Sequence, residues 1–146
     1  MTAALDTLSA ALFAPVQGAA FTLHGADGPV VAMLGDGAYM FNNPSACHWA
    51  AEAHGLPILT VIFNNRRWGA VRNSTLAMYA QGASPADDGM FMADLSPSVD
   101  HVGLARAHGA HAEATGDLSA LPGLVERALT AVDGGQQALI ALDLPE

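Results

Sequence analysis

Short continuous apolar runs alternate with segments of helical spacing along most of the chain. The runs at 29–34, 56–63 and 137–144 contain few polar residues, a pattern typical of parallel strands that are covered on both faces. A shorter segment at 110–115 is predicted to be a further strand. Strands that alternate with helices predict an open, mostly parallel α/β sheet with helices on both faces.

Helix signals fill the intervals between these strands. Helices are predicted at 3–23 with an interruption around 14–18, at 43–55, at 66–78 after an initial turn, at 98–109 and at 117–134. Asn43 is a plausible N-cap with Pro44 at the first helical position, and Gly55 is a plausible C-terminal stop. Asp117 is a plausible N-cap of the last helix.

Residues 79–98, "YAQGASPADDGMFMADLSPS", interrupt this alternation. The segment has no hydrophobic period and carries several Gly, Pro and Asp residues, so it is predicted to be a long loop. Long loops inside compact domains are often lids or binding loops, which makes a lid the working hypothesis here. No internal repeat is visible, and residues 1–146 are interpreted as one domain.

Composition narrows the class of protein. The chain has 146 residues, of which 51% are hydrophobic and 13% charged, so a packed core is expected rather than disorder. A net charge of -9 argues against nucleic acid or an anionic membrane surface as the main partner. The single Cys47 and the lack of any apolar run of about 18 to 20 residues lead us to expect a soluble protein of the reducing cytoplasm, without a signal peptide.

The positive charges are unevenly distributed. The chain has no lysine, and three of its five arginines, Arg66, Arg67 and Arg72, fall within seven residues. A local positive patch on an acidic protein indicates an anionic ligand nearby. Solvated loop arginines explain the cluster equally well at this stage.

Two strand ends carry the candidate chemistry. Asp36 lies between Gly35 and Gly37 after the first apolar run, and the second run ends in Asn64 and Asn65. A strand–helix–strand crossover places both ends at the same edge of a parallel sheet, where open α/β folds bind ligands. Flanking glycines allow close approach of a ligand such as phosphate. These strand ends are therefore expected to form one site.

The charge of Asp36 determines what that site can bind. A carboxylate and a phosphate about 4 Å apart repel each other by about 4 kcal/mol at an effective dielectric constant of about 20. A divalent cation between them reverses the sign. Mg²⁺ needs only one or two protein oxygens, because phosphates and water complete its octahedron. The pattern therefore favours a metal-bridged phosphate site.

Other readings of the polar residues are weaker. The segment "GDGAYM" lacks the third glycine of the dinucleotide fingerprint, a chain without lysine excludes a Walker-type loop, and no serine-hydrolase elbow is present. Several polar residues are better explained by structural roles. These are a helix cap at Asn42–Asn43, a polar contact of His48 with Glu52, and dipole-compatible histidines near a helix end, His101, His108 and His111.

The spacing of the two strand ends resembles a known signature. Gly35-Asp36-Gly37, followed after 26 residues by Asn64-Asn65, resembles the Gly-Asp-Gly … Asn-Asn motif of thiamine diphosphate-dependent enzymes. The continuation "NNRRWGAVR" is similar to the stretch that follows this motif in the acetolactate synthase and benzoylformate decarboxylase group. The likeness runs from about Gly18 to the C-terminus and implies the thiamine diphosphate-binding fold, as its pyrophosphate-binding domain.

The resemblance implies a role for each matching position. Side-chain oxygens of Asp36 and Asn65 and the backbone carbonyl of Arg67 would ligate Mg²⁺. The residues expected around the diphosphate, mostly through backbone N–H groups, are Gly35, Gly37, Ala38, Trp68 and Gly69. Ala38 replaces the serine often found at its position, which removes a hydroxyl but leaves the N–H.

The resemblance also implies a function with a missing half. It indicates the thiamine diphosphate and Mg²⁺ binding domain of a 2-oxo acid decarboxylase or carboligase (a lyase or transferase) similar to acetolactate synthase. The family's pyrimidine-binding domain, whose glutamate activates the cofactor, has no counterpart in this sequence. The N-terminal strand and the glycine-rich loop that precede the motif in the family are also not evident. Leu8 lies near the position of the bulky apolar residue of that loop, but without the glycines. No catalytic residue is therefore expected in this chain.

The missing half leads to expectations about assembly. The chain is expected to be inactive alone and to join a pyrimidine-binding domain or subunit in a homo- or hetero-oligomer that acts on a small 2-oxo acid. Both a subunit of a split enzyme and a truncated piece fit the sequence. The alternative is a non-catalytic α/β domain that binds a nucleotide, a diphosphate or a partner chain.

Overall fold

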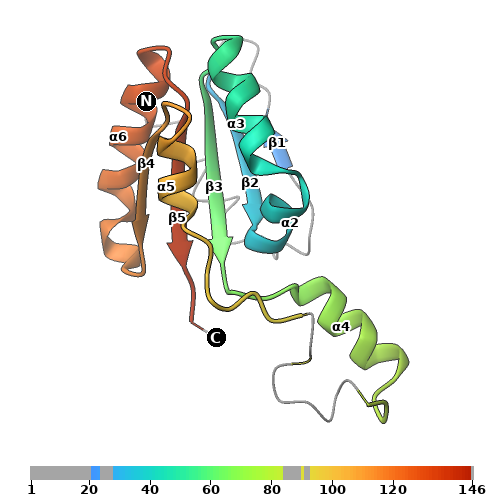
Figure 1. Cartoon of the computed structure of the whole chain (residues 1–146). Coiled ribbons are helices and arrows are strands. Elements are labelled where there is room, and N and C mark those ends of the chain that lie inside the picture. Colours follow the sequence, from blue (N-terminus) through green and yellow to red (C-terminus); the bar gives the residue numbers. More distant parts are fainter. Residues whose placement is uncertain (1–20, 24–27, 84–89, 91–92, 146) are drawn as a thin grey trace.

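A five-stranded sheet forms the centre of the molecule (Figure 1). The computed structural model describes residues 21–23, 28–83, 90 and 93–145. The strands are β1 (Phe21–Leu23), β2 (Val30–Gly35), β3 (Ile58–Asn64), β4 (His111–Thr115) and β5 (Ala138–Asp143), in the order β1-β2-β3-β5-β4. All neighbours pair in parallel except β1, which is antiparallel to β2. The predicted open, mostly parallel sheet is confirmed.

Helices cover both faces of this sheet. They are α2 (Asp36–Phe41), α3 (Pro44–Ala53), α4 (Gly69–Met78), α5 (His101–Arg106) and α6 (Leu121–Asp133), the last preceded by the 3₁₀ turn η2 (Leu118–Ala120). In Figure 1, α2, α3 and α5 lie on one face and α6 lies on the other. Helix α4 projects beyond the carboxyl ends of the strands and buries none of its residues.

Continuous apolar strands supply two cores at once. In β3, Val61 packs with α6 residues such as Val125, whereas the next residue, Ile62, packs with Tyr39 of α2 and Ala105 of α5. Successive side chains of a strand point to opposite faces, so an uninterrupted apolar run can serve both layers. This arrangement explains why the strands were recognisable from sequence.

Glycine ends three of the helices. Gly55, Gly109 and Gly135 have φ values of +58°, +74° and +85°, in the left-handed region that favours glycine. After α3, the N–H of Leu56 donates to Ala51 O at 2.8 Å and that of Gly55 donates to Glu52 O at 3.2 Å. This is the Schellman pattern, and the predicted stop at Gly55 is confirmed.

The starts of the helices follow the prediction less closely. Asn43 is the N-cap residue of α3 and Pro44 its first residue, as predicted, but the φ of Asn43 is 52° and its side chain makes no capping hydrogen bond. Its neighbour Asn42 instead donates its side-chain amide to Ala38 O at the end of α2. Asp117 does cap, accepting from Ser119 N at 2.9 Å, although it caps the 3₁₀ turn that precedes α6.

The structure corrects the helix predicted near the N-terminus at the residues that it describes there. Residues 21–23 form strand β1, not the end of a helix, because their backbone pairs with β2 from Phe21 with Met33 to Leu23 with Val31. A three-residue edge strand has too few positions to show a period. Residues 3–20 lie outside the described part of the chain, as do 84–89 and 91–92 of the predicted loop. The described remainder of that loop contains no helix or extended strand, and its role as a lid stays a prediction.

None of the helices described here is long and apolar enough to cross a membrane.

Candidate functional site

The carboxyl ends of three strands lie side by side. Gly35 pairs with Phe63, so Asp36 and Asn64 follow directly on neighbouring strands. Asn64 in turn pairs with Asp143 of β5. The structure therefore brings the two strand ends singled out in the sequence to one edge, with Asp143 as a third polar group.

Asp36 is buried at this edge as the first residue of α2. Its side chain is 3% exposed, and its Oδ2 atom has no hydrogen-bond partner among the described residues. Burial raises the pKa of Asp36. Three influences lower this pKa and only partly offset the burial: a backbone hydrogen bond from Gly37, the nearby His101, and backbone hydrogen bonds from Arg66 and Arg67. A buried carboxylate oxygen without a partner is unfavourable unless a cation or donor reaches it.

The segment after β3 is held in a fixed loop. Arg67 N donates to Asn65 Oδ1 at 3.1 Å, and Arg66 adopts a left-handed φ of 56°. Leu95 N donates to Arg66 O at 2.8 Å and Trp68 N donates to Ala93 O at 2.8 Å, which ties the loop to the returning chain. Non-glycine residues in the left-handed region are strained, and such strain clusters at functional sites.

The two segments touch each other. A Cβ atom placed on Gly37 would lie 3.5 Å from the Trp68 ring. Within the second segment, one placed on Gly69 would lie 3.9 Å from the side-chain nitrogen of Asn65. The Trp68 ring also meets Phe41 edge-on, with ring centroids 6.2 Å apart. The eight residues named from the sequence thus fall on two adjoining segments. They are Gly35, Asp36, Gly37, Ala38, Asn65, Arg67, Trp68 and Gly69.

Two polar residues at this edge, Asn64 of the motif and His101, were given no role in the site from the sequence. Asn64 is 3% exposed and donates to Ser98 Oγ at 3.0 Å and to Asp143 Oδ1 at 2.7 Å, while its Oδ1 lacks a partner in the described structure. His101 is 4% exposed, and its Nε2 likewise lacks one. Burial lowers the pKa of His101, against the opposing effect of Asp36. It begins α5, so the expectation that it sits near a helix end is wrong for this histidine.

The predicted contact between His48 and Glu52 is also wrong. His48 Nε2 lies 2.9 Å from the Tyr39 hydroxyl and Nδ1 lies 2.8 Å from Gln137 Oε1. Gln137 reaches His48 from the start of β5, a long-range contact that helical spacing could not indicate. Glu52 instead rests against Gly109.

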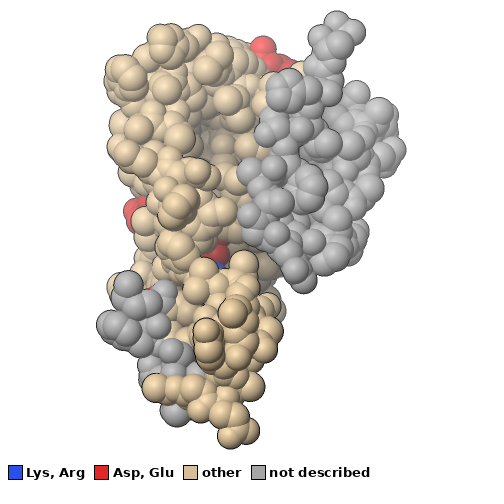
Figure 2. Space-filling view, turned by 90° about the vertical axis from the view of Figure 1, so that its right-hand side faces the viewer, with Lys and Arg blue, Asp and Glu red and all other residues tan. Residues whose placement is uncertain are grey.

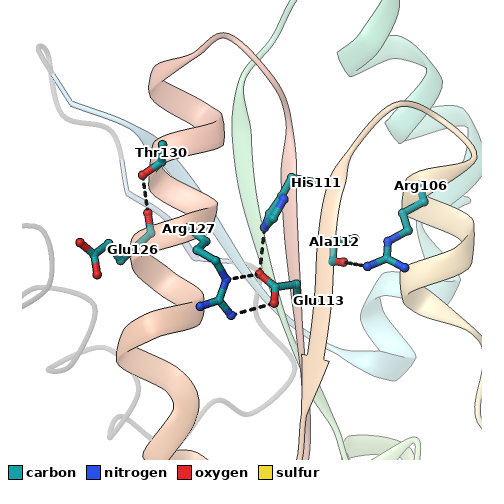
Figure 3. A network of polar contacts seen from close by, with 7 residues as sticks. All are labelled: Arg106, His111, Ala112, Glu113, Glu126, Arg127 and Thr130. Carbon is teal, nitrogen blue, oxygen red and sulfur yellow. Dashed lines mark hydrogen bonds and ion pairs between the residues drawn. The ribbon is translucent and has the colours of Figure 1, made fainter.

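Four of the five arginines fall into two groups, one at β4 and one beside Asp36. Arg127 of α6 makes a two-pronged ion pair with Glu113 of β4, at 2.8 Å and 2.7 Å, and Arg106 of α5 donates to Ala112 O at 2.7 Å (Figure 3). These contacts fasten α6 and α5 to β4, far along the sheet from β2. Arg66 and Arg67 belong to the loop beside Asp36, and the anionic ligand expected there stays a prediction.

A match to a family model shows to which protein family the chain belongs. The model described as "Thiamine pyrophosphate enzyme, C-terminal TPP binding domain" matches residues 7–141. The chain belongs to this family. The family resemblance drawn from the two strand ends is thereby confirmed, and binding of thiamine diphosphate follows as the general property of the domain.

Solved structures show the same fold. A thiamine diphosphate-dependent 4-hydroxybenzoylformate decarboxylase from Rhodococcus jostii RHA1 superposes with a TM-score of 0.67 at 23% identity, covering 83% of this chain and 20% of that one. Benzoylformate decarboxylase from Polynucleobacter necessarius gives 0.62 at 20% identity, covering 80% and 20%. A putative thiamin diphosphate-dependent enzyme from Mycobacterium smegmatis gives 0.59 at 22% identity, covering 82% and 19%. The chain thus spans about one fifth of the length of these proteins.

Proposed function

We propose that this domain holds thiamine diphosphate through a magnesium ion at the carboxyl edge of the sheet. Side-chain oxygens of Asp36 and Asn65 and the backbone carbonyl of Arg67 are the proposed ligands. The observation that carries this proposal is the buried Oδ2 of Asp36, which has no partner among the described residues. The hydrogen bonds that fix Arg66 O and Trp68 N on either side support a fixed position for the Arg67 carbonyl.

The donor types favour magnesium over softer metals. The described residues contain no group of three or more His, Cys, Asp or Glu side chains arranged to hold a metal ion. One carboxylate, one amide oxygen and one carbonyl form a hard oxygen set with a small negative charge. Mg²⁺ suits such a set, because it takes its remaining ligands from phosphates and water.

The diphosphate is proposed to lie against the starts of α2 and α4. Ala38 falls in the first turn of α2 and Gly69 begins α4, and N–H groups in the first turn of a helix have no intrahelical acceptor. Trp68 needs a revised role, since its N–H already donates to Ala93 O. Its ring, packed beside Gly37, is proposed to shape the pocket instead.

We assign the chain to a 2-oxo acid decarboxylase or carboligase similar to acetolactate synthase. Bound thiamine diphosphate would supply the electron sink for decarboxylation of the substrate. The residues of this chain would bind and orient the diphosphate end, and a pyrimidine-binding domain or subunit would supply the activating glutamate. Two of the similar structures are named as decarboxylases of benzoylformates, which supports a 2-oxo acid as substrate class.

The exposed side of α4 supports docking of that second domain. Phe41, at the end of α2, is 77% exposed, and Met78 and Tyr79, at the C-terminal end of α4, are 72% and 63% exposed. Figure 2, which views this side, shows few charged side chains on the described residues. Exposed apolar patches of this kind usually mark a partner surface, so we propose a homo- or hetero-oligomeric enzyme.

Calorimetric titration with thiamine diphosphate, with and without Mg²⁺ and in parallel with ATP, tests the binding proposal. We expect binding only with the divalent cation, and a clear preference over ATP. Equal binding of ATP would support the alternative, a general nucleotide- or diphosphate-binding domain. Retained affinity for thiamine diphosphate in excess chelator would contradict the metal bridge.

An assay of the purified chain with pyruvate and benzoylformate tests the need for a partner. With cofactor and Mg²⁺ present we expect no turnover, because half of the cofactor would face water and no activating glutamate is identified. Addition of a pyrimidine-binding partner should restore it. Robust decarboxylation by this chain alone would show that it contains an activating group of its own.

A further inference from the structure

Three buried polar atoms at the carboxyl edge lack hydrogen-bond partners among the described residues. They are Asp36 Oδ2, Asn64 Oδ1 and His101 Nε2, referred to below as the unpartnered trio. Their side chains are 3%, 3% and 4% exposed, so bulk water does not satisfy them. Buried polar atoms in folded proteins are nearly always hydrogen-bonded to protein or to ordered water.

The trio belongs to one neighbourhood. Asp36 and Asn64 follow the last ladder pair of β2 and β3. Asn64 lies two residues after Ile62, so its side chain faces the layer of α2 and α5. His101 begins α5 and meets the Tyr39 ring edge-on at 5.4 Å, and it interacts electrostatically with both Asp36 and Asp143.

The donors and acceptors of the trio match, in number and type, those of a single water molecule. Asp36 Oδ2 and Asn64 Oδ1 are acceptors, and the Asn64 amide nitrogen already donates to Ser98 and Asp143. One water can donate its two hydrogens to these two oxygens and accept a third hydrogen bond from an imidazole N–H. Three hydrogen bonds is the usual number for a buried water.

We propose that His101 is a positioning residue for Asp36, acting through a buried water. In this arrangement His101 Nε2–H donates to the water, and the water donates to Asp36 Oδ2 and Asn64 Oδ1. A carboxylate oxygen has two lone-pair positions, so Oδ2 accepts this bond and still faces a metal ion. His101 thus orients the carboxylate that the proposed function assigns to Mg²⁺, and this second step rests on that proposed function.

His48 provides a matched comparison for His101. It is a buried residue of α3, and both of its ring nitrogens have protein partners, Tyr39 Oη and Gln137 Oε1. The Gln137 amide nitrogen donates to two carbonyls, His48 O and His108 O, so its oxygen must accept from His48 Nδ1–H. His48 therefore has a fixed structural role, and the opposite tautomer from the one proposed for His101.

Long-range ¹H–¹⁵N NMR of the chain without cofactor tests the hydrogen bond itself. We expect His101 as the Nε2–H tautomer and His48 as the Nδ1–H tautomer. Asp36→Asn should shift the Nε2 resonance of His101 and leave that of His48 unchanged. A His101 ring in the Nδ1–H tautomer, or one insensitive to Asp36→Asn, would overturn the proposal whether or not the chain binds thiamine diphosphate.

Calorimetry of Mg²⁺ binding in the presence of thiamine diphosphate tests the positioning role. His101→Phe should lower the affinity about 10- to 100-fold, the usual effect of losing a group that orients a metal ligand. His101→Gln, which keeps a polar atom near the Nε2 position, should recover much of this loss. Thermal unfolding of the cofactor-free His101→Phe protein should change little, because the phenyl ring fills the space of the imidazole and the water keeps its bonds to Asp36 Oδ2 and Asn64 Oδ1.

The control His48→Phe should show the reverse pattern, with lower thermal stability and unchanged affinity. Wild-type affinity in His101→Phe would overturn the positioning role. Loss of affinity together with a matching loss of stability, not recovered by His101→Gln, would assign His101 to the core instead. Failure of the wild-type protein to bind would refute the proposed function, and the NMR result would still decide the hydrogen bond.

Discussion

The hydrogen bonding of buried polar groups differs between two regions of the sheet face that α2, α3 and α5 cover. In the interior, Gln137 makes hydrogen bonds to His48 and to the backbone of His48 and His108, and the Tyr39 hydroxyl completes the set at 2.9 Å from His48. At the carboxyl edge, Asp36, Asn64 and His101 each keep an atom without a partner among the described residues. A saturated network fits a structural role, whereas unsaturated buried groups fit a site prepared for a ligand.

Asp36→Ala is expected to have the largest effect on binding. Loss of a group that merely orients a metal ligand weakens metal binding about 10- to 100-fold, so loss of the ligand itself should exceed about 100-fold. Stability of the cofactor-free protein should change little, because the cost of burying the carboxylate offsets the backbone hydrogen bonds from Gly37, Arg66 and Arg67 that the substitution removes. Calorimetry and thermal unfolding measure the two effects. Normal affinity for the cofactor together with lower stability would show that Asp36 has a structural role like that of Gln137.

Gln137→Ala should show the opposite behaviour. It removes the acceptor of His48 Nδ1 and the side-chain donor to the carbonyls of His48 and His108, and each buried group left unsatisfied costs about 1–3 kcal/mol. Chemical denaturation should report a loss of a few kcal/mol, with cofactor affinity retained. Equal losses of affinity and stability would show that the two regions are not separable.

Two asparagines sharpen the comparison. Asn65→Ala should weaken Mg²⁺-dependent binding about 10-fold or more with little change in stability. Asn43→Ala should instead cost about 1 kcal/mol of stability, because alanine tolerates the left-handed backbone at this position poorly. Asn43→Gly separates this reason from capping: the backbone explanation predicts no loss, and a lost side-chain cap predicts a small one. Denaturation and calorimetry of the three variants check these outcomes.

Glu113 offers the smallest effect, in a polar network that joins β4 to α6. Hydrogen bonds from Arg127, and then from His111, lower the pKa of Glu113 to about 2, against an unfolded value of 4.5. Its contribution to stability is therefore present above pH 4.5 and is lost as the pH falls toward 2. Exposed ion pairs contribute about 0.2–1 kcal/mol. Glu113→Gln should remove this pH dependence in denaturation experiments and leave binding unchanged.

The sequence predicted the parts of the fold that depend on local or periodic patterns. Continuous apolar runs identified β2, β3 and β5, and Gly55 was correctly assigned as a helix stop because its role depends only on its own backbone. The strand β1 was missed, since residues 21–23 are defined by their pairing with β2 and not by any period. Asn43 and Pro44 correctly predicted where α3 begins, but the left-handed backbone of Asn43, which sequence could not show, explains its presence better than a side-chain cap does.

The site was predictable in outline but not in its surroundings. Asp36 and the loop at 65–69 could be identified because both follow apolar strands and match a spaced motif. Asn64 and Asn65 are identical in type, yet one points into the α2–α5 layer and the other lies in the loop. His101 gave no local signal, because its proximity to Asp36 depends on how α5 packs on the sheet.

Paramagnetic NMR with Mn²⁺ in place of Mg²⁺, in the presence of thiamine diphosphate, tests the central claim most directly. The account predicts that Mn²⁺ broadens backbone signals of Gly37, Arg67 and Gly69 first, then those of His101. Signals of Gln137, at the start of β5, should remain sharp at the same metal concentration. Broadening centred on Gln137, or spread evenly over the surface acidic residues, would contradict a metal site at Asp36.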